Sequence, residues 1–291
     1  TIYDDHPHNW DAWDIDIYYE TCPIVHLEAQ SYEIVSEGDA FKQIKFSYQF
    51  GKSTFIQLIT LSQASPMLEI NHQVNWQEKH KMLRAAFPAN IPNGKAYYDI
   101  AYGYIERPNN RNTTWDLARF ECATHKYAGL SSQSNGFFVL NDSKYGYKIV
   151  ENVIDVCLLR SPTDPDPEAD TGSHEFKLAL LPNQDHFSNS NIPSEALQFN
   201  NPPLVLNGKL KKNFPIKINS SNVTLEAVKK CEFDNSIIVR LVENKGKLNN
   251  ITVSLPNNSK CIETNLMEKE ITQLQATNNQ LNLSFTPFEI K

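Results

Sequence analysis

The sequence predicts an all-β protein, in which a large antiparallel sandwich is followed by a smaller one, and three observations support this. Apolar residues alternate with polar ones in many short runs; in residues 67–76, for example, Leu68, Ile70, Val74 and Trp76 share one face with His72. Clusters of Gly, Pro, Asn and Asp separate these runs. No stretch carries a long amphipathic helix pattern, which favours antiparallel sandwiches over βαβ units.

The larger sandwich is predicted over residues 1–190, where strand patterns follow one another at short spacing. The expected strands are residues 45–50, 54–61, 67–76, 82–87, 97–105, 117–123, 136–140, 153–159 and 176–181. Turns are expected between them at Gly51-Lys52, Ser65-Pro66, Pro92-Asn93-Gly94, Pro108-Asn109-Asn110 and Asn141-Asp142-Ser143. These residue types tolerate turn conformations or form local hydrogen bonds, so each cluster is a suitable strand boundary.

The composition changes near residue 190. Residues 183–193 are rich in Asn and Ser, and Pro202-Pro203 follows, so we expect a linker over 191–205. Residues 206–291 then have the size of an Ig-like sandwich. Short strands are expected at 204–206, 214–218, 223–227, 236–242, 251–255, 262–266, 271–274 and 281–285. Residues 263–277 include good helix formers, but Ile271 and Thr272 favour a strand–turn–strand arrangement.

Composition excludes several classes of protein. The chain has 291 residues, of which 40% are hydrophobic and 21% charged, as in ordinary globular domains. A net charge of -7 argues against binding to a nucleic-acid backbone, and a mean hydropathy of -0.47 argues against a membrane-spanning segment. The five cysteines lack zinc-site spacing, so we expect reduced thiols and no metal site in this chain. Sequons such as Asn222-Val223-Thr224 leave a secretory compartment open.

The first segment whose residue types suit ligand binding or catalysis is residues 4–16, which holds two Trp, two His and five Asp in thirteen positions. An aromatic ring packs on the apolar face of a sugar, and carboxylates accept hydrogen bonds from its hydroxyls. The candidates are Trp10, Asp11, Trp13 and Asp14. Asp and His together are also suited to a divalent metal, whereas the plainest alternative is a loop with core aromatics and turn-capping acids.

Two further blocks are polar. Residues 159–176 form a proline-stiffened loop with Asp166, Asp170 and His174, whose carboxylates suit a glycosidase acid pair or a solvated connection. Residues 102–116 contain Arg107, Arg111 and Trp115, which suit either ligand stacking or a structural corner of arginine, acid and aromatic side chains.

Several motifs in these blocks resemble one known family. They are Asn-Trp-Asp-Ala-Trp-Asp-Ile-Asp at 9–16, Tyr-Gly-x-Ile-Glu-Arg-Pro at 102–108, Arg-Asn-Thr-Thr-Trp-Asp-x-Ala-Arg-Phe-Glu at 111–121, Leu-Asn-Asp-Ser-Lys-Tyr-Gly-Tyr at 140–147, Leu-Leu-Arg-Ser-Pro at 158–162, Pro-Asp-Pro-Glu-Ala-Asp at 165–170 and His-Glu-Phe at 174–176. Together they resemble the C-terminal half of glycoside hydrolase family 38 α-mannosidases, in its cytosolic, vacuolar and bacterial branch. The resemblance covers residues 1–182, and beyond residue 204 it rests on domain order and the closing Pro-Phe-Glu-Ile-Lys.

The resemblance implies a retaining exo-α-mannosidase with an N-terminal barrel, a helical bundle and a galactose-mutarotase-like supersandwich followed by a smaller β-sandwich. In the family, the nucleophile, the acid/base and the zinc ligands belong to the barrel and bundle. We therefore expect no catalytic residue, metal or cofactor in this chain, and zinc in a preceding catalytic domain. The chain begins at Thr1 without Met, which fits an N-terminally incomplete supersandwich that is inactive alone.

The expected partners are the N-terminal catalytic portion of the same α-mannosidase and mannose-containing oligosaccharides, with a possible homo-oligomer and neither nucleic acid nor membrane. A cytoplasmic location is favoured over a vacuolar or lysosomal one. The residues expected nearest the substrate cleft are Trp10, Asp11, Trp13, Asp14, Asp166, Asp170 and His174. One alternative is a stand-alone carbohydrate-binding or scaffold module; another is an epimerase-like enzyme using His174 with its neighbouring acids, by fold analogy alone.

Overall fold

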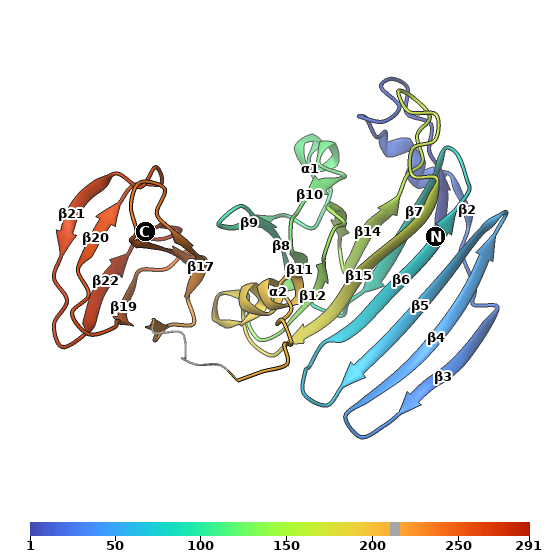
Figure 1. Ribbon diagram of the computed structural model, residues 1–291. Coiled ribbons are helices and arrows are strands. Elements are labelled where there is room, and N and C mark those ends of the chain that lie inside the picture. The colour runs from blue at the N-terminus through green and yellow to red at the C-terminus, as the bar shows by residue number, and fades with distance from the viewer. Residues whose placement is uncertain (93, 210–215) are drawn as a thin grey trace. The chain divides into compact units, whose positions relative to one another are not determined.

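The computed structural model describes residues 1–92, 94–209 and 216–291 (Figure 1). Strands dominate it, which confirms the predicted all-β class. The chain divides into two compact units. The first contains Thr1–Asp99 and Ile105–Asn201, and the second contains Ile100–Tyr104 and Pro202–Lys291.

A nine-stranded antiparallel sheet is the largest element, with the order β3-β4-β5-β6-β15-β12-β11-β8-β9. Figure 1 shows β4, β5, β6 and β15 as its long neighbouring strands. The bounds are β3 Ser31–Glu37, β4 Phe41–Phe50, β5 Ser53–Ser62, β6 Leu68–Trp76, β8 Lys95–Ile100, β9 Gly103–Arg107, β11 Tyr127–Ser131, β12 Gly136–Asn141 and β15 Gly172–Asn183.

A six-stranded sheet forms the second layer of the first unit, with the order β10-β13-β14-β7-β1-β2. Its strands are β1 Ile2–Asp4, β2 Pro23–Val25, β7 Lys81–Pro88, β10 Cys122–Ala123, β13 Gly146–Val150 and β14 Val153–Leu159. Alternate residues of β14 show how the layers meet: Ile154, Val156 and Leu158 belong to the buried apolar core. The same core contains Trp76 and Phe176 of the larger sheet. The intervening Asp155 therefore faces away from that core, because successive strand side chains alternate between faces.

Within residues 216–291, the second unit has seven short strands around a smaller apolar core. They are β16 Lys217–Ile218, β17 Val223–Lys230, β18 Ile237–Glu243, β19 Asn249–Ser254, β20 Cys261–Thr264, β21 Glu270–Leu274 and β22 Gln280–Phe285. The predicted strand–turn–strand over 263–277 is confirmed, since β20 pairs with β21. Asn265 accepts hydrogen bonds from the amides of Met267 and Lys269 in the turn between them. Residues 204–206 form no strand. The strand expected at 214–218 and the turn expected at Asn93 lie partly outside the described residues.

Three expected elements of the first unit differ from the structure. Residues 97–105 form β8 and β9 rather than one strand, because the chain turns at Tyr102, which has a φ of 59°. Of the strand expected at 117–123, only Cys122–Ala123 is strand, and its start belongs to helix α1, Thr114–Ala118, whose N-terminus Thr113 and Asp116 cap reciprocally. Residues 192–200, inside the expected linker, form helix α2, Ile192–Asn200, whose Ile192 and Ala196 are buried.

Replacing Gly129 with alanine should destabilise the first unit by about 1–3 kcal/mol, which is the usual cost of overpacking. Gly129 lies opposite Phe138 in the β11–β12 pair, and an added Cβ would press on the Phe138 ring and lie 2.5 Å from the carbonyl oxygen of Phe137. Urea denaturation measures the change. Gly38→Ala is the control, because its Cβ would meet nothing closer than 3.6 Å. Equal stability of the two variants would contradict the argument.

Candidate functional site

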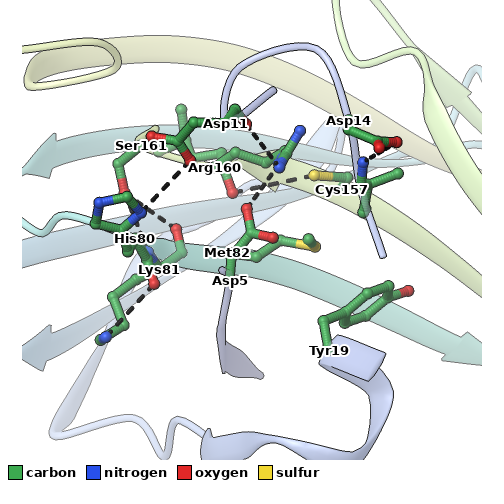
Figure 2. Close-up of polar contacts among 12 residues, drawn as sticks. Asp5, Asp11, Asp14, Tyr19, His80, Lys81, Met82, Cys157, Arg160 and Ser161 are labelled. Carbon is green, nitrogen blue, oxygen red and sulfur yellow. Dashed lines mark hydrogen bonds and ion pairs between the residues drawn. The ribbon is translucent and has the colours of Figure 1, made fainter. Parts of the chain in front are cut away.

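Two loops far apart in the sequence meet beside the β6–β7 turn, namely the N-terminal segment around Asp11 and the loop 160–171. The Asp11 carboxylate accepts hydrogen bonds from the amides of Thr163, at 2.7 Å, and Asp164, at 3.2 Å. On its other oxygen, Asp11 lies 3.5 Å from Nδ1 of His80, while Nε2 of that ring lies 2.9 Å from the Thr163 hydroxyl. Figure 2 shows Asp11, His80 and Arg160 converging on this junction.

A buried ion pair between Arg160 and Asp5 supports the same junction. Arg160 donates through Nε to the Asp5 carboxylate at 2.7 Å and through Nη2 to the carbonyl oxygen of Asp11 at 3.3 Å. Asp5 is 3% exposed, so this carboxylate is removed from water and needs its partner. Arg160 thus connects the start of the loop 160–171 to the N-terminal segment at two points, Asp5 and Asp11.

The second anchor of the loop is Asp170. Its carboxylate accepts hydrogen bonds from the amides of Arg160, at 3.2 Å, and Ser161, at 3.1 Å, so the loop closes on itself at its base. His174 donates through Nε2 to the carbonyl oxygen of Asp170 at 2.7 Å. Asp170 and His174 therefore shape the loop, and their contacts among the described residues are structural ones.

The backbone at this junction is strained. Trp10, His80, Ser161 and Asp170 have φ values of 57°, 51°, 61° and 60°, which is the left-handed region that residues with a side chain seldom adopt. Such conformations persist only where surrounding contacts determine them, and they concentrate at functional sites. The carboxylates of Asp11 and Asp170 provide these contacts. Specific contacts therefore hold the two polar loops of the junction against each other in a defined conformation.

Replacing Asp11 with alanine should open the loop 160–171 locally. We expect amide exchange at Thr163 and Asp164 to rise roughly tenfold, because losing hydrogen bonds to a charged acceptor costs about 1.5 kcal/mol. Hydrogen–deuterium exchange measures the effect. Asp14→Ala is the control, because its carboxylate accepts only from the neighbouring amide of Ile15 at 2.9 Å among the contacts described. We call the hydrogen bonds from the Thr163 and Asp164 amides to the Asp11 carboxylate the Asp11 clamp. Unchanged amide exchange in the Asp11 variant would contradict a role of this clamp in holding the loop.

The stability that the Asp11 clamp gives to the loop 160–171 should depend on pH. Burial opposes ionisation of Asp11, but hydrogen bonds from Thr163 and Asp164 and the nearby His80 outweigh it and hold the pKa of Asp11 below its usual value. A carboxylate with a lowered folded-state pKa stabilises the fold above its unfolded pKa of about 3.9. We therefore expect the protection factor of the Thr163 amide, which is its exchange rate compared with that of the unfolded chain at the same pH, to be constant near neutral pH. It should fall as the pH drops through the lowered pKa of Asp11.

The two tryptophans of the N-terminal block point into solvent. Trp10 is 71% exposed and Trp13 is 70% exposed, although tryptophan is a residue that folding usually covers. Their backbone is fixed all the same, because the carbonyl oxygen of Trp10 accepts hydrogen bonds at 2.8 Å from the amides of both Trp13 and Asp14. Two exposed rings therefore lie on a fixed turn next to the junction.

The structure brings some of the expected site residues together and leaves others apart. Asp11, Asp170 and His174 lie in or beside the junction, whereas the Asp14 and Asp166 carboxylates cap their own turns, Asp166 accepting from the Glu168 amide at 2.9 Å. Sequence reasoning did not select the residues that complete the junction, which are Asp5, His80, Arg160, Ser161 and Thr163. No spacing rule pairs them, because they come from three segments that only the fold brings together.

A buried charged layer covers the outer face of the six-stranded sheet nearby. Arg84 of β7 pairs with Asp155 at 2.9 Å and with Glu121 at 2.6 Å, and its side chain is 1% exposed. Tyr19, from the short helix η1 at Ile17–Thr21, donates to Glu121 at 2.8 Å. Burial opposes the charge of Arg84, but the two carboxylates outweigh it and raise the pKa of Arg84 above its usual value. Burial in turn raises the pKa of Glu121.

Arg111, from the third polar block, belongs to this layer. Its two terminal nitrogens donate to the two oxygens of Glu20, each at 2.6 Å, and Lys148 lies 3.0 Å from the same carboxylate. Bidentate pairs of this kind are strong and directional. For Arg111 the structure thus favours the structural corner over ligand stacking.

The described residues contain no group of three or more His, Cys, Asp or Glu arranged to hold a metal ion. The residues present therefore do not fit a zinc site, and no metal-dependent step is assigned to them. Within the same residues, none of the helices has the length and apolar character that a membrane span requires.

Comparison with known families finds one match in each of the two units. Residues 1–168 match the profile of the glycosyl hydrolases family 38 C-terminal domain. Residues 222–291 match the family 38 C-terminal beta sandwich domain. The chain belongs to glycoside hydrolase family 38. The resemblance of its sequence motifs to this family is thereby confirmed.

Relatives of this family 38 chain are similar over its whole length. Human alpha-mannosidase 2C1 is 33% identical over 99% of the chain. Alpha-mannosidase G of Dictyostelium discoideum is 34% identical over 100%, and an alpha-mannosidase of Saccharomyces cerevisiae is 31% identical over 99%. The chain spans 29%, 28% and 30% of the lengths of these relatives. The crystal structure of an alpha-mannosidase from Enterococcus faecalis V583 shares the fold, with a TM-score of 0.76 at 16% identity over 91% of this chain and 34% of that one.

Proposed function

We propose that this chain is the C-terminal β region of a retaining exo-α-mannosidase that hydrolyses terminal α-mannosyl residues of oligosaccharides. The observation that carries the proposal is the match of both family 38 C-terminal profiles, in order, on a chain similar throughout to named alpha-mannosidases. The remaining 70% or so of such an enzyme would supply the catalytic acids and zinc. The present region would supply part of the substrate cleft and a surface against which the catalytic portion packs.

The cleft surface in this proposal is the aromatic turn of Trp10 and Trp13 beside the Asp11 junction. Sugar rings offer apolar C–H faces to exposed indoles, and polar groups nearby accept from or donate to hydroxyls. The junction holds this turn rigid, which lowers the entropy that substrate binding must overcome. Of the residues expected near the cleft, the exposed ones are free to touch substrate, namely Trp10, Trp13, Asp14 and Asp166. Asp11 and Asp170 hold the loops that support them in place.

The packing surface is the open end of the nine-stranded sheet. Strand β3 is the edge strand, and its side chains are exposed on both faces, with Tyr32 70%, Ile34 57% and Val35 46% exposed. The adjoining β4 and β5 are only partly buried, whereas β12 is almost fully buried. Apolar residues at an unprotected sheet edge favour association. We propose that the N-terminal portion of the same polypeptide covers this end, because the relatives are more than three times as long.

The decisive experiment compares the full-length polypeptide with the 291-residue chain on an aryl α-mannoside with added zinc. The expected result is turnover by the full-length protein and none by the chain alone. Turnover by the chain alone would mean that its own carboxylates are catalytic. The absence of turnover by the zinc-loaded full-length protein would refute the enzymatic proposal.

A second experiment tests the packing surface. Sedimentation of the isolated chain should show self-association that disappears when the N-terminal portion is co-expressed. A Tyr32→Lys/Ile34→Lys variant should reduce this self-association, with Val205→Lys, at a position that is 91% exposed, as the control. A monomeric wild-type chain at high concentration would contradict the proposed surface.

A stand-alone carbohydrate-binding module is the second candidate, and the exposure of Trp10 and Trp13 favours it. Calorimetric titration of the isolated chain with mannobiose separates the two functions. Micromolar affinity that is lost in Trp10→Ala would favour the binding module, and the absence of measurable binding would favour a cleft wall that works only in the whole enzyme.

A further inference from the structure

Three arginines line a small cavity beside helix α1 that the proposed function does not use. Arg107 ends strand β9, Arg111 precedes the helix, and Arg119 follows it, and all three contribute to the wall of a cavity of about 20 Å³. Tyr98 and Cys122 also line it. Guanidinium groups repel one another at short range, so such a cluster requires negative charge nearby.

The charges around the cavity do not balance. Arg111 is paired with Glu20, and Arg119 is paired with Asp116 at 2.9 Å. For Arg107, by contrast, no carboxylate lies within ion-pair distance in the ranges 1–92, 94–209 and 216–291. Its guanidinium carbon lies 5.7 Å from the centre of the Tyr98 ring, a contact that provides no counter-charge.

The thiol in the cavity wall does not supply the missing charge either. Burial raises the pKa of Cys122, so its sulfur stays protonated near neutral pH. The cavity therefore carries one guanidinium in excess of the acids that contact its three arginines.

Two hydrogen-bond donors of this cluster are also unsatisfied. Nε of Arg107 and Nε of Arg111 are fully buried, and neither has an acceptor among the described residues. Glu20 binds the two terminal nitrogens of Arg111, which leaves the Nε side of that guanidinium uncovered. Buried donors without an acceptor are rare because their desolvation is costly, so each of these atoms requires an explanation.

We propose that this cavity binds one chloride-sized monovalent anion, held by Arg107 and Arg111 through their Nε–H groups. The cavity is large enough for at least one water-sized group, so a small monovalent anion fits it. The unpaired charge of Arg107 favours an anion over a neutral water, since hydrogen bonds between charged groups are the stronger ones. A bound anion would join β9, the loop before α1 and, through Glu20, helix η1.

The direct test is crystallographic and uses the whole protein, crystallised without chloride and soaked in sodium bromide. We expect an anomalous peak within about 3.5 Å of Nε of both Arg107 and Arg111, at millimolar bromide. A water in the cavity under every condition would overturn the proposal. So would a side chain from another part of the protein inserted there, or occupancy by bromide only at molar concentration.

The second test measures stability in solution. The melting temperature should rise saturably by about 2–4 °C as chloride replaces gluconate at constant ionic strength, because a ligand that binds only the folded state stabilises it. Arg107→Gln should abolish the chloride dependence, and Arg240→Gln, which removes a positive charge from the second unit, should preserve it. A chloride response that is equal in all three proteins would be a general salt effect and would overturn the proposal.

Discussion

Replacing Arg84 with methionine is expected to lower the free energy of unfolding of the first unit by about 3–5 kcal/mol, which is the usual cost of breaking a buried ion pair. Arg84 lies under the charged layer with a side chain that is 1% exposed, between Asp155 and Glu121. Methionine fills much of the space but removes the cation that pairs with Glu121, and it leaves Asp155 with only Lys148, at 3.4 Å. An uncompensated charge in this environment is among the few single changes that destabilise a domain severely.

The pH dependence of this variant distinguishes a charge effect from a packing effect. Burial already raises the pKa of Glu121, and removing Arg84 should raise it further. A carboxyl group whose folded-state pKa is raised is tolerated at low pH, and its stabilising contribution is lost as the pH rises through that value. Denaturation between pH 5 and 8 should therefore show a deficit that grows with pH. A deficit that is the same at every pH would indicate lost packing alone.

The matched control for Arg84 is Lys95→Met. Lys95 and Glu106 form an ion pair at 2.6 Å, but their side chains are 64% and 41% exposed. Exposed pairs contribute about 0–1 kcal/mol, so this variant should remain close to wild type. Comparable losses in the two variants would show that burial of the Arg84 pair is not what determines its contribution.

The second large effect is expected in the whole enzyme and rests on the proposed function. Trp10→Ala/Trp13→Ala should raise KM for an α-mannosyl oligosaccharide about tenfold while kcat stays close to wild type. Covering about 50–60 Å² of indole surface at roughly 25 cal/mol per Å² is equivalent to about 1.4 kcal/mol, or a factor of ten. The contact is made in both ground and transition states, so its loss appears in KM.

The control for the tryptophan pair is Trp115→Ala. Trp115 is 78% exposed and lies on helix α1, away from the Asp11 junction in sequence and contacts. It should leave KM unchanged, and all these variants should unfold like wild type because the rings are not buried. A normal KM in the double variant, with turnover intact, would remove these rings from the cleft without challenging the enzyme's identity.

Much of the fold was predictable from local patterns. The strands β6 and β14 were expected because their apolar residues alternate with polar ones, and the structure buries Val74, Trp76, Ile154 and Val156 of these strands in the shared core. Helix α1 and the break between β8 and β9 were not, since a capping pair and a left-handed residue interrupt segments rich in apolar side chains. The edge strand β3 was also missed, because neither of its faces is buried within this chain.

The candidate site, like the fold, was predictable from the sequence only in part. The sequence alone identified the aromatic and acidic segments around Trp10 and Asp170, because residue types and motifs are local properties of the chain. Only the tertiary structure showed that Asp11 and Asp170 hold the loops while Trp10 faces solvent, and that His80 and Arg160 complete the junction. Burial, ion pairing and strain depend on segments that lie up to 155 residues apart in the sequence, and no sequence period encodes that proximity.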